Sequence, residues 1–325
     1  MIDLGQKDAY IIEQHGGIPE FSSEDIESTI TKKYNFSFKK LSDRFFKSDC
    51  TEESVNELAF VRRYGKIIGI FENLEDIRNI SLPEGKFYIR VIDHGGCHGT
   101  EHERIIGDQV KAKGRVSFSD NDFVLLIFHV ESWYVTLERV KKDKKNNERR
   151  APMRPYFTPI SMDPQFAAFL VNMGYFRKGS RLLDPFCGSG GILIEAGVKG
   201  YQVSGIDILP QMAMGASVNL KFYGIKDFNI TKTDFLKIEK YEKYDGIITD
   251  FPYGRNSHIS TSQEIFYTQC AKAMNEVLES GSRACIVTDN PENLEFFKNY
   301  FTVDKILKQR IHASLTRNFV RLIKN

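Results

Sequence analysis

The stretch RLLDPFCGSGG at residues 181–191 decides the fold of this chain. An apolar strand ends at Asp184, a turn follows through Gly188 and Gly190, and an apolar helical pattern then runs to Val198. Glycine has no Cβ, so the backbone can turn tightly there and approach a ligand closely. The amino end of the following helix offers free N–H groups to the polar end of that ligand. The stretch therefore predicts a strand–turn–helix unit that cradles a nucleoside cofactor.

Strand and helix patterns alternate from this unit onward, which is typical of a mostly parallel sheet. Strands are expected at residues 181–185, 202–207, 228–231, 244–249 and 282–288, and helices at about 190–198, 210–223 and 262–278. Two late strands, 302–308 and 317–323, have only a short connection and should form an antiparallel hairpin. An α/β sheet that ends in this way is typical of the methyltransferase variant of the Rossmann architecture.

The length and composition of the chain set the frame for the whole molecule. With 325 residues, of which 41% are hydrophobic and 27% charged, two soluble globular domains are expected. The five cysteines form no CxxC pair, which argues against a disulfide framework and favours a reducing cytoplasm. The first residues lack the apolar run of a signal peptide, and no stretch of the sequence approaches a membrane span.

The first 140 residues mix helix and strand patterns and predict an α+β module. Ser22 or Ser23 is expected to cap a helix that carries Ile26 and Ile30 on one face. Thr51 is expected to cap a second helix. The remaining expected elements are strands at 67–71 and 87–92, a helix that opens with the capping box at 100–103, and a hairpin of 123–130 and 134–140.

Positive charge gathers in residues 138–154, between the two halves of the chain. This tract holds eight basic and three acidic side chains, a local charge of +5, whereas the whole chain carries only +2. It lacks apolar periodicity and is interpreted as a linker. Two hypotheses stay open for it: a solvated linker, or a strip that contacts nucleic-acid phosphates. In the second case the substrate-binding candidates are Lys141, Lys142, Lys144 and Lys145.

Asp184 has acidic counterparts at the ends of the next two predicted strands. Asp207 follows it by 23 residues, where an acidic side chain commonly accepts hydrogen bonds from ribose hydroxyls. Asp184 is expected to meet an ammonium group or an ordered water, and Asp234 to accept a hydrogen bond from an adenine amine. One such residue could be an ordinary turn residue, but three at successive strand ends favour a cofactor site. The turn GSGGIL lacks the third glycine of GxGxxG, which disfavours a dinucleotide.

The motif Asp250-Phe251-Pro252-Tyr253 follows the fourth predicted strand of this half. The exocyclic amine of guanine or adenine is a poor nucleophile because its lone pair is delocalised into the ring. The Asp250 carboxylate and the Phe251 carbonyl can accept hydrogen bonds from this amine and direct its lone pair at a methyl donor. Pro252 restricts the backbone, and Tyr253 can stack on the base. Arg255 could contact phosphate or base, or be an exposed side chain without a role.

Together, the cofactor turn and the acceptor motif predict methyl transfer from S-adenosylmethionine to an amino group of a nucleobase. The transfer is an in-line displacement from a sulfonium, so proximity and orientation should dominate the catalysis. Cys187, within the turn, is expected to pack and not to react.

One cluster has a spacing that zinc could use, but several glycines around it favour a surface loop, so no metal is expected. Its members are His94, Cys97, His98 and His102. Trp133, in the predicted hairpin, is expected to lie in the core.

In the order of these motifs, the second half of the chain resembles the archaeal-type tRNA guanine-10 N2-methyltransferases. The matching stretches are RPYFTP (154–159), DPFCGSG (184–190), GIDI (205–208), DFPYGR (250–255) and SLTR (314–317). Residues 85–140 are similar to the THUMP domain of these enzymes, and residues 1–80 to its ferredoxin-like partner. The resemblance implies an RNA-binding module at 1–140, a basic linker at 141–154 and an S-adenosylmethionine-dependent methyltransferase domain at 155–325.

The resemblance also implies a substrate, the N2 amine of a tRNA guanine, with position 10 expected. It leaves open whether one methyl group or two are added and whether a small activating subunit takes part. Alternatives are another tRNA position or ribosomal RNA, and, from another class, a non-catalytic RNA-binding protein with a vestigial fold. The family usually has DPPY where this chain has Phe251. The backbone carbonyl survives this change, but the loop is expected to be less rigid.

Overall fold

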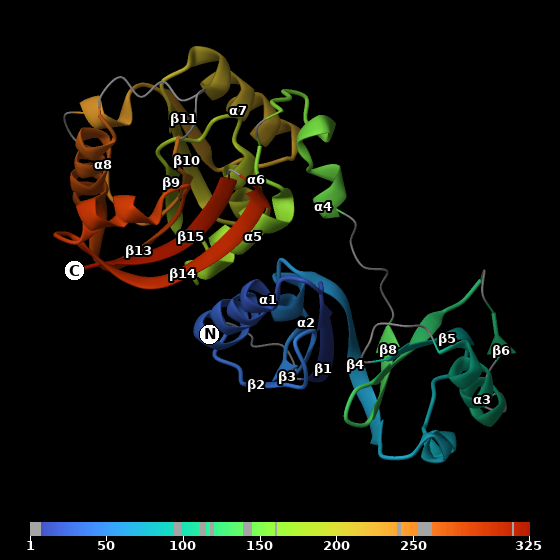
Figure 1. Cartoon of the computed structure of the whole chain (residues 1–325). Coiled ribbons are helices and arrows are strands. Elements are labelled where there is room, and N and C mark those ends of the chain that lie inside the picture. Colours follow the sequence, from blue (N-terminus) through green and yellow to red (C-terminus); the bar gives the residue numbers. More distant parts are fainter. Residues whose placement is uncertain are drawn as a thin grey trace. The chain divides into compact units, whose positions relative to one another are not determined.

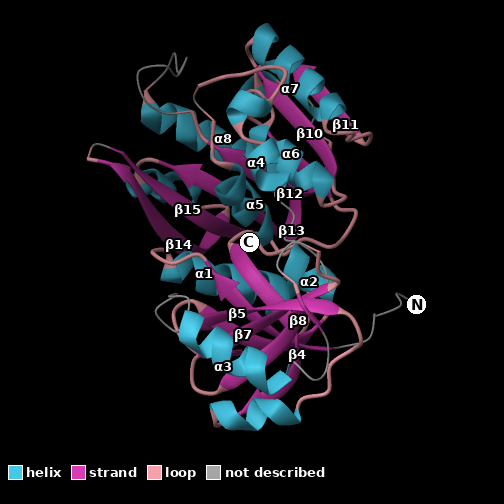
Figure 2. Cartoon of the chain, turned by 90° about the vertical axis from the view of Figure 1, so that its right-hand side faces the viewer, coloured by secondary structure: helices cyan, strands magenta, loops and turns pink. Residues whose placement is uncertain are grey.

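The computed structural model describes residues 8–93, 99–110, 115–117, 120–138, 145–159, 161–238, 242–252, 262–313 and 315–325. The chain separates into two compact units, Met1–Asp143 and Lys144–Asn325. Each unit contains both helices and strands (Figure 1, Figure 2). In the described part of the chain, no helix is long and apolar enough to cross a membrane.

The first unit is an eight-stranded sheet with the order β2-β3-β1-β4-β8-β7-β5-β6. Neighbouring strands pair antiparallel, except that β5 lies parallel to β6 and β7. The strands are β1 (Asp8–Gln14), β2 (Phe38–Lys40), β3 (Phe45–Cys50), β4 (Val61–Phe71), β5 (Lys86–Asp93), β6 (Arg115–Val116), β7 (Phe123–His129) and β8 (Trp133–Glu138). The helices are α1 (Pro19–Ile26), a π-helix (Glu27–Lys33), α2 (Glu52–Asn56), a 3-10 helix (Leu74–Asn79) and α3 (Thr100–Val110).

The long strand β4 joins the two parts of this sheet. Its first half pairs with β1 and its second half with β8. Three apolar clusters lie in the described part of this unit. One contains Ile12 and Phe46, the second Val91 and Ile127, and the third Ile11 and Phe128. The α+β module expected for the first 140 residues is therefore one continuous sheet with several buried clusters.

The helix cap expected at Ser22 or Ser23 is wrong. Helix α1 begins at Pro19, with Ile18 as its N-cap residue, so both serines lie inside the helix. Proline suits the first helical position because its fixed φ matches the helix and its missing N–H has no partner to lose there. The cap expected at Thr51 is confirmed, since its side chain accepts a hydrogen bond from the Ser54 N–H at 3.3 Å.

The second unit is a seven-stranded sheet with the order β11-β10-β9-β12-β13-β15-β14. The first five strands in this order pair in parallel, and β15 pairs antiparallel with both β13 and β14. The strands are β9 (Arg181–Asp184), β10 (Gln202–Asp207), β11 (Phe228–Lys232), β12 (Tyr244–Asp250), β13 (Leu278–Thr288), β14 (Phe301–His312) and β15 (Leu315–Lys324). The helices are α4 (Lys145–Glu148), α5 (Pro164–Met173), α6 (Gly191–Val198), α7 (Pro210–Phe222) and α8 (Gln263–Val277), with 3-10 turns at Ala151–Met153, Phe235–Lys237 and Pro291–Phe297.

Helices α6 and α7 lie on one side of this sheet and α8 on the other (Figure 1). The buried core under α8 includes Ile247, Tyr267, Met274 and Val320. The three helices begin and end within one residue of the expected positions, and the late hairpin is antiparallel as expected. The Rossmann-like fold predicted from the alternating pattern is confirmed.

Two arginines of the basic tract are packed into the second unit and do not belong to a solvated linker. Arg149 forms a bidentate ion pair with Glu195 of α6, at 2.8 and 2.9 Å, and Glu195 is buried. Arg154 is also buried and donates a hydrogen bond to the Arg149 carbonyl at 2.9 Å. The buried Glu195 carboxylate needs a charged partner, which explains why Arg149 is held inside the unit.

The packing between β10 and α6 leaves no room for a side chain at Gly205. A Cβ there would lie 2.6 Å from Cδ1 of Leu193 and 2.9 Å from Sγ of Cys187. We expect Gly205→Ala to lower the free energy of unfolding by about 1–3 kcal/mol, because overpacking pushes the helix off the sheet. Urea unfolding followed by circular dichroism measures this. The control is Gly107→Ala in α3, where the nearest atom is 3.7 Å away and no loss is expected. Equal destabilisation by both changes would contradict the prediction.

Candidate active site

The strand order of the second sheet reverses beside β9, because β10 and β11 lie on one side of it and β12 and β13 on the other. In open α/β sheets the loops at such a point diverge and leave a crevice at the carboxyl ends of the strands. Asp184 ends β9, Asp207 ends β10 and Asp250 ends β12. Three predicted site residues therefore lie at the same edge of the sheet.

Asp184 is the buried centre of this edge, with 1% of its surface exposed. Its Oδ1 accepts hydrogen bonds from the Thr249 hydroxyl at 2.6 Å and from the Phe186 N–H at 3.1 Å. Burial is the main cause that raises the pKa of the Asp184 carboxyl to about 7. The charges of Asp250 and Asp207 add to this increase, and the two hydrogen bonds oppose it.

The glycine turn after β9 has the backbone that the sequence predicts. Gly188 and Gly190 have φ angles of +52° and +82°, a region that favours glycine. The Asp207 carboxylate accepts hydrogen bonds from the Gly188 N–H and the Leu209 N–H, both at 2.9 Å. Burial raises the pKa of Asp207. The end of β10 therefore holds the turn of β9 in place.

The N-cap residue of α6 is Gly190, which has no side chain that could cap the helix by a hydrogen bond. A helix start without a cap leaves backbone N–H groups that suit a carboxylate. A Cβ on Gly190 would lie 3.2 Å from Cβ of Ala216, so the turn packs tightly against α7. The donor set fits a cofactor with a carboxylate at this helix and hydroxyl groups near Asp207.

Asp234 lies after β11, at the start of a 3-10 turn. Its side chain accepts a hydrogen bond from the Leu236 N–H at 3.0 Å, and one of its oxygens lies 3.7 Å from Nζ of Lys237. Asp234 is half-buried. It follows β11, which is the neighbour of β10 in the sheet. This position is compatible with the cofactor role predicted for it, which stays a prediction.

The acceptor motif begins at the end of β12. Asp250 is half-buried, and Nη2 of Arg317 lies 3.7 Å from its Oδ2. Arg317 comes from β15, the antiparallel strand two places away in the sheet. Pro252 is half-buried, and the structure describes the motif only as far as this residue.

Several predicted residues lie outside the described part of the chain. Their roles in base stacking and in phosphate contact stay predictions. These residues are Tyr253 and Arg255 of the acceptor motif, Lys141, Lys142 and Lys144 of the basic tract, and the side chain of Lys145, whose backbone belongs to α4.

Phe251, which stands where a proline is usual, is anchored in two ways. Its ring is 1% exposed and lies 5.1 Å from the Tyr267 ring and 5.4 Å from the Phe186 ring, measured between centroids. Its N–H donates a hydrogen bond to the Val287 carbonyl at 3.0 Å, which a proline could not do. The expected loss of rigidity is therefore offset by side-chain packing and by this extra hydrogen bond.

The segment before α5 contributes residues to the site that we did not assign from the sequence. The Thr158 hydroxyl lies 3.0 Å from the Ser189 hydroxyl in the glycine turn. The Asn219 amide of α7 donates to the carbonyls of Tyr156 and Ser189, each at 3.0 Å. In the sequence, the motif RPYFTP marked this segment as similar to the family but did not indicate what its residues contact. The sequence did not reveal Thr249 and Arg317, because each contacts a residue on a different strand: Thr249 contacts Asp184, and Arg317 contacts Asp250.

The remaining predictions concern packing and metal binding. Cys187 is buried, and burial raises the pKa of its thiol well above the ordinary value, so it packs as expected. Trp133 lies in the core, with His102 edge-on to its ring at 5.2 Å. The described residues contain no group of His, Cys, Asp and Glu that could hold a metal ion. His94, Cys97 and His98 lie outside them.

Comparison of the sequence with known families and proteins gives consistent matches. Residues 151–318 match the family model described as "RMKL-like, methyltransferase domain". The chain is 31% identical over 282 residues to the tRNA (guanine(10)-N2)-dimethyltransferase of Pyrococcus abyssi. This match covers 82% of this chain and 85% of the relative. The chain is 38% identical over 180 residues to the enzyme of the same name from Methanothermobacter thermautotrophicus, covering 55% of this chain and 53% of the relative.

A solved structure supports the architecture over the whole length. TrmN from Thermus thermophilus matches with a TM-score of 0.60, covering 98% of this chain and 99% of that one, at 17% sequence identity. At this identity the match concerns the fold alone.

The raised pKa of Asp184 predicts how stability depends on pH. The folded protein keeps a proton on this carboxyl between about pH 4 and pH 7, where the unfolded chain has lost it. The free energy of unfolding should therefore fall as the pH rises through this window, by roughly a few kcal/mol. Asp184→Asn keeps the acceptor oxygen for both hydrogen bonds but removes the titration, so its fall should be smaller. Urea unfolding at several pH values, without ligand, measures the free energy of unfolding of the wild type and of Asp184→Asn. The same dependence on pH in the two proteins would contradict the prediction.

Proposed function

The chain belongs to the family of tRNA (guanine(10)-N2)-dimethyltransferases, and we propose that it methylates the exocyclic N2 amine of guanine 10 in tRNA with S-adenosylmethionine as donor. The observation that carries this proposal is the acceptor motif at the end of β12, beside the glycine turn of β9 at the strand-order reversal. Intact carboxylates at these strand ends argue against a vestigial, non-catalytic fold. The names of the relatives favour position 10 over another RNA site.

The cofactor site fits S-adenosylmethionine through groups of this chain. We assign the methionine carboxylate to the amino end of α6 and the ammonium to the region of Asp184. Asp207 would accept hydrogen bonds from the ribose hydroxyls, and Asp234 from the adenine amine. The turn at Gly188 and Gly190 gives the backbone close access to the ligand. When bound, S-adenosylmethionine supplies an electrophilic methyl group on a sulfonium.

The acceptor site prepares the amine for attack. The Asp250 carboxylate and the Phe251 carbonyl would each accept one N–H of the guanine amine, which localises its lone pair toward the methyl group. Forming the N–C bond breaks the S–C bond, and the nitrogen then loses a proton. Arg317, whose Nη2 lies 3.7 Å from Oδ2 of Asp250, would orient this carboxylate. After one transfer N2 keeps one hydrogen, so a second transfer is chemically open, in agreement with the names of the relatives.

The two units divide the work in this proposal. Residues 1–140 would serve as a ferredoxin-like and THUMP module that docks tRNA, with the lysines of 141–145 contacting phosphates. Residues 155–325 would hold the cofactor and perform the transfer. Cys50, Cys187 and Cys270 are free thiols and are buried, which supports a reducing cytoplasm. A small activating subunit stays a prediction.

The function is tested by the product and by Asp250. The wild-type protein, a tRNA transcript and S-adenosylmethionine should yield N2-methylated guanosine at position 10, detected by mass spectrometry of nuclease fragments. Asp250→Ala should lower turnover by about 10²–10³-fold or more, the loss typical of a preorganised polar contact. The control is Asp227→Ala, an exposed carboxylate before β11. A transcript with adenine at position 10 should not react. Wild-type turnover in Asp250→Ala, or methylation elsewhere, would overturn the proposal.

The cofactor assignment has its own test. Asp207→Ala should weaken S-adenosylmethionine binding by about 1.5–3 kcal/mol, the range for hydrogen bonds to a charged group. Isothermal titration calorimetry measures this affinity without RNA. Because Asp207 also holds the Gly188 N–H, circular dichroism should verify that the variant is folded. Asp227→Ala should bind like the wild type. Unchanged affinity in folded Asp207→Ala would refute the assignment.

A further inference from the structure

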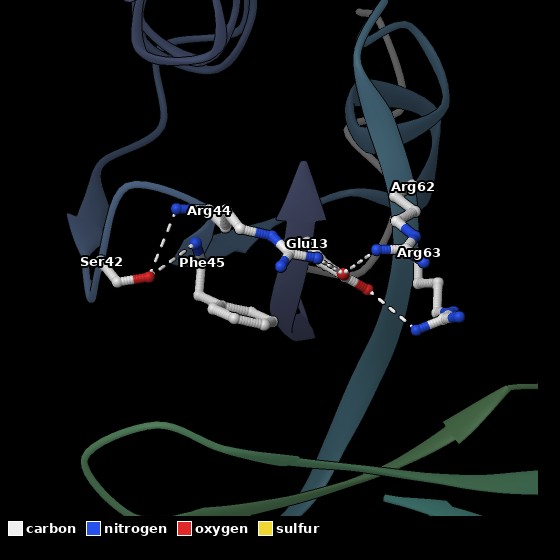
Figure 3. A network of polar contacts seen from close by, with 6 residues as sticks. All are labelled: Glu13, Ser42, Arg44, Phe45, Arg62 and Arg63. Carbon is white, nitrogen blue, oxygen red and sulfur yellow. Dashed lines mark hydrogen bonds and ion pairs between the residues drawn. The ribbon is translucent and has the colours of Figure 1, made fainter. Parts of the chain in front are cut away.

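Three arginines of the first unit converge on one buried carboxylate (Figure 3). Glu13, near the end of β1, is completely buried. Its Oε1 pairs with Arg44 and with Nη1 of Arg62, the latter at 3.3 Å, and its Oε2 lies 3.3 Å from Nη1 of Arg63. The arginine side chains are 21%, 39% and 26% exposed in the same order. We call these four residues the Glu13 cluster.

A strand irregularity brings two consecutive arginines to the same carboxylate. Neighbouring residues of a strand normally point to opposite faces of the sheet. The pairing of β1 with β4 shifts between Glu13, which faces Arg63, and Gln14, which faces Val61. Arg62 is the extra residue at this shift, and a bulge of this kind redirects a side chain. Both guanidinium groups can therefore reach Glu13.

Arg44 is fixed by its own loop. The Ser42 hydroxyl accepts hydrogen bonds from the N–H groups of Arg44 and Phe45, each at 3.3 Å (Figure 3). The Arg44 carbonyl accepts one from the Gln14 N–H at 2.8 Å. Phe45 is completely buried, and the Arg44 guanidinium lies 5.8 Å from the centre of its ring. This arginine is therefore preorganised, whereas a typical surface arginine is mobile.

The cluster has more positive charge and more donors than its internal contacts need. One bidentate arginine would satisfy Glu13, yet three are present, so the four residues carry a net charge of about +2. Each guanidinium has five N–H donors, far more in total than one carboxylate can accept. Nε of Arg44 is buried and has no hydrogen-bond partner among the described residues. Glu138, which acts on Arg63, is the further acidic neighbour, and burial raises its pKa.

We propose that the Glu13 cluster binds a backbone phosphate of tRNA, through those N–H groups of the partly exposed Arg44, Arg62 and Arg63 that Glu13 does not use. This inference rests on the proposed function for the identity of the RNA. Phosphate oxygens match the planar guanidinium fork, and arginines already held in place lose less entropy on binding. The chain as a whole carries a charge of only +2, so its RNA affinity must come from local excess charge such as this.

The test removes the two arginines that Glu13 needs least. In Arg62→Gln/Arg63→Gln, Arg44 still neutralises the buried carboxylate. We expect the affinity of the full-length protein for a tRNA transcript to fall at least about 10-fold. The slope of log affinity against log salt should decrease by about 1, because the contact with one phosphate is lost. Fluorescence anisotropy over a series of salt concentrations, without cofactor, measures both quantities.

A matched control separates a built site from general electrostatics. Lys39→Gln/Lys40→Gln removes the same charge from β2 of the same unit, where Lys39 pairs with Glu131 and Lys40 with Asp43, each at 2.7 Å. This pair should change the salt slope by less than half as much. An equal change in both double variants, or a wild-type slope in the arginine variant, overturns the proposal. Circular dichroism of both variants verifies that the first unit is folded.

Kinetics distinguish this site from the methylation site. The arginine variant should raise KM for tRNA and leave the turnover at saturating tRNA unchanged, since the cluster only docks the substrate. A loss of turnover at saturation with unchanged RNA affinity would also overturn the proposal. The binding measurement needs no methylation. It therefore remains decisive for the cluster even if the protein does not modify guanine 10.

Discussion

The hydrogen bond from the Thr249 hydroxyl to the Asp184 carboxylate joins β12 to β9 beneath the site, at 2.6 Å. These two strands are neighbours at the reversal of strand order: the glycine turn follows β9, and the motif proposed to hold the acceptor follows β12. A buried carboxyl group needs hydrogen-bond partners, and Asp184 has two of them in Thr249 and Phe186. Asp184 thus ties together the carboxyl ends of the two strands.

The acceptor motif illustrates how a local departure is compensated by its surroundings. Phe251 leaves the backbone torsion freer than a proline would, yet its ring packs among Phe186, Tyr267 and Phe297. Its N–H gains a bond to Val287 that proline would forfeit. The backbone at Phe251 is therefore held by tertiary packing and a hydrogen bond, and not by a proline ring.

The net charge of the chain is only +2, so its positive surface charge depends on where individual basic residues gather. Part of the basic tract is structural, since Arg149 neutralises the buried Glu195. Conversely, a positive patch forms where no basic run exists: Arg44 and the Arg62–Arg63 pair lie far apart in the sequence, and meet only because β1 lies between β3 and β4 in the sheet. A run of basic residues in the sequence therefore need not form a positive surface, and a positive surface can form from residues that are distant in the sequence.

The sequence by itself determined the Rossmann-like half, the three carboxylates at strand ends and the position of the acceptor motif. Hydrophobic periodicity, glycine turns and strand-end residues are local signals, so they can be recognised without the fold. Only the tertiary structure decided that Thr249 holds Asp184, that Arg317 faces Asp250, and that three arginines share one glutamate. These contacts join residues on different strands, and strand order and register arise from the packing of the whole sheet, not from a pattern along one strand.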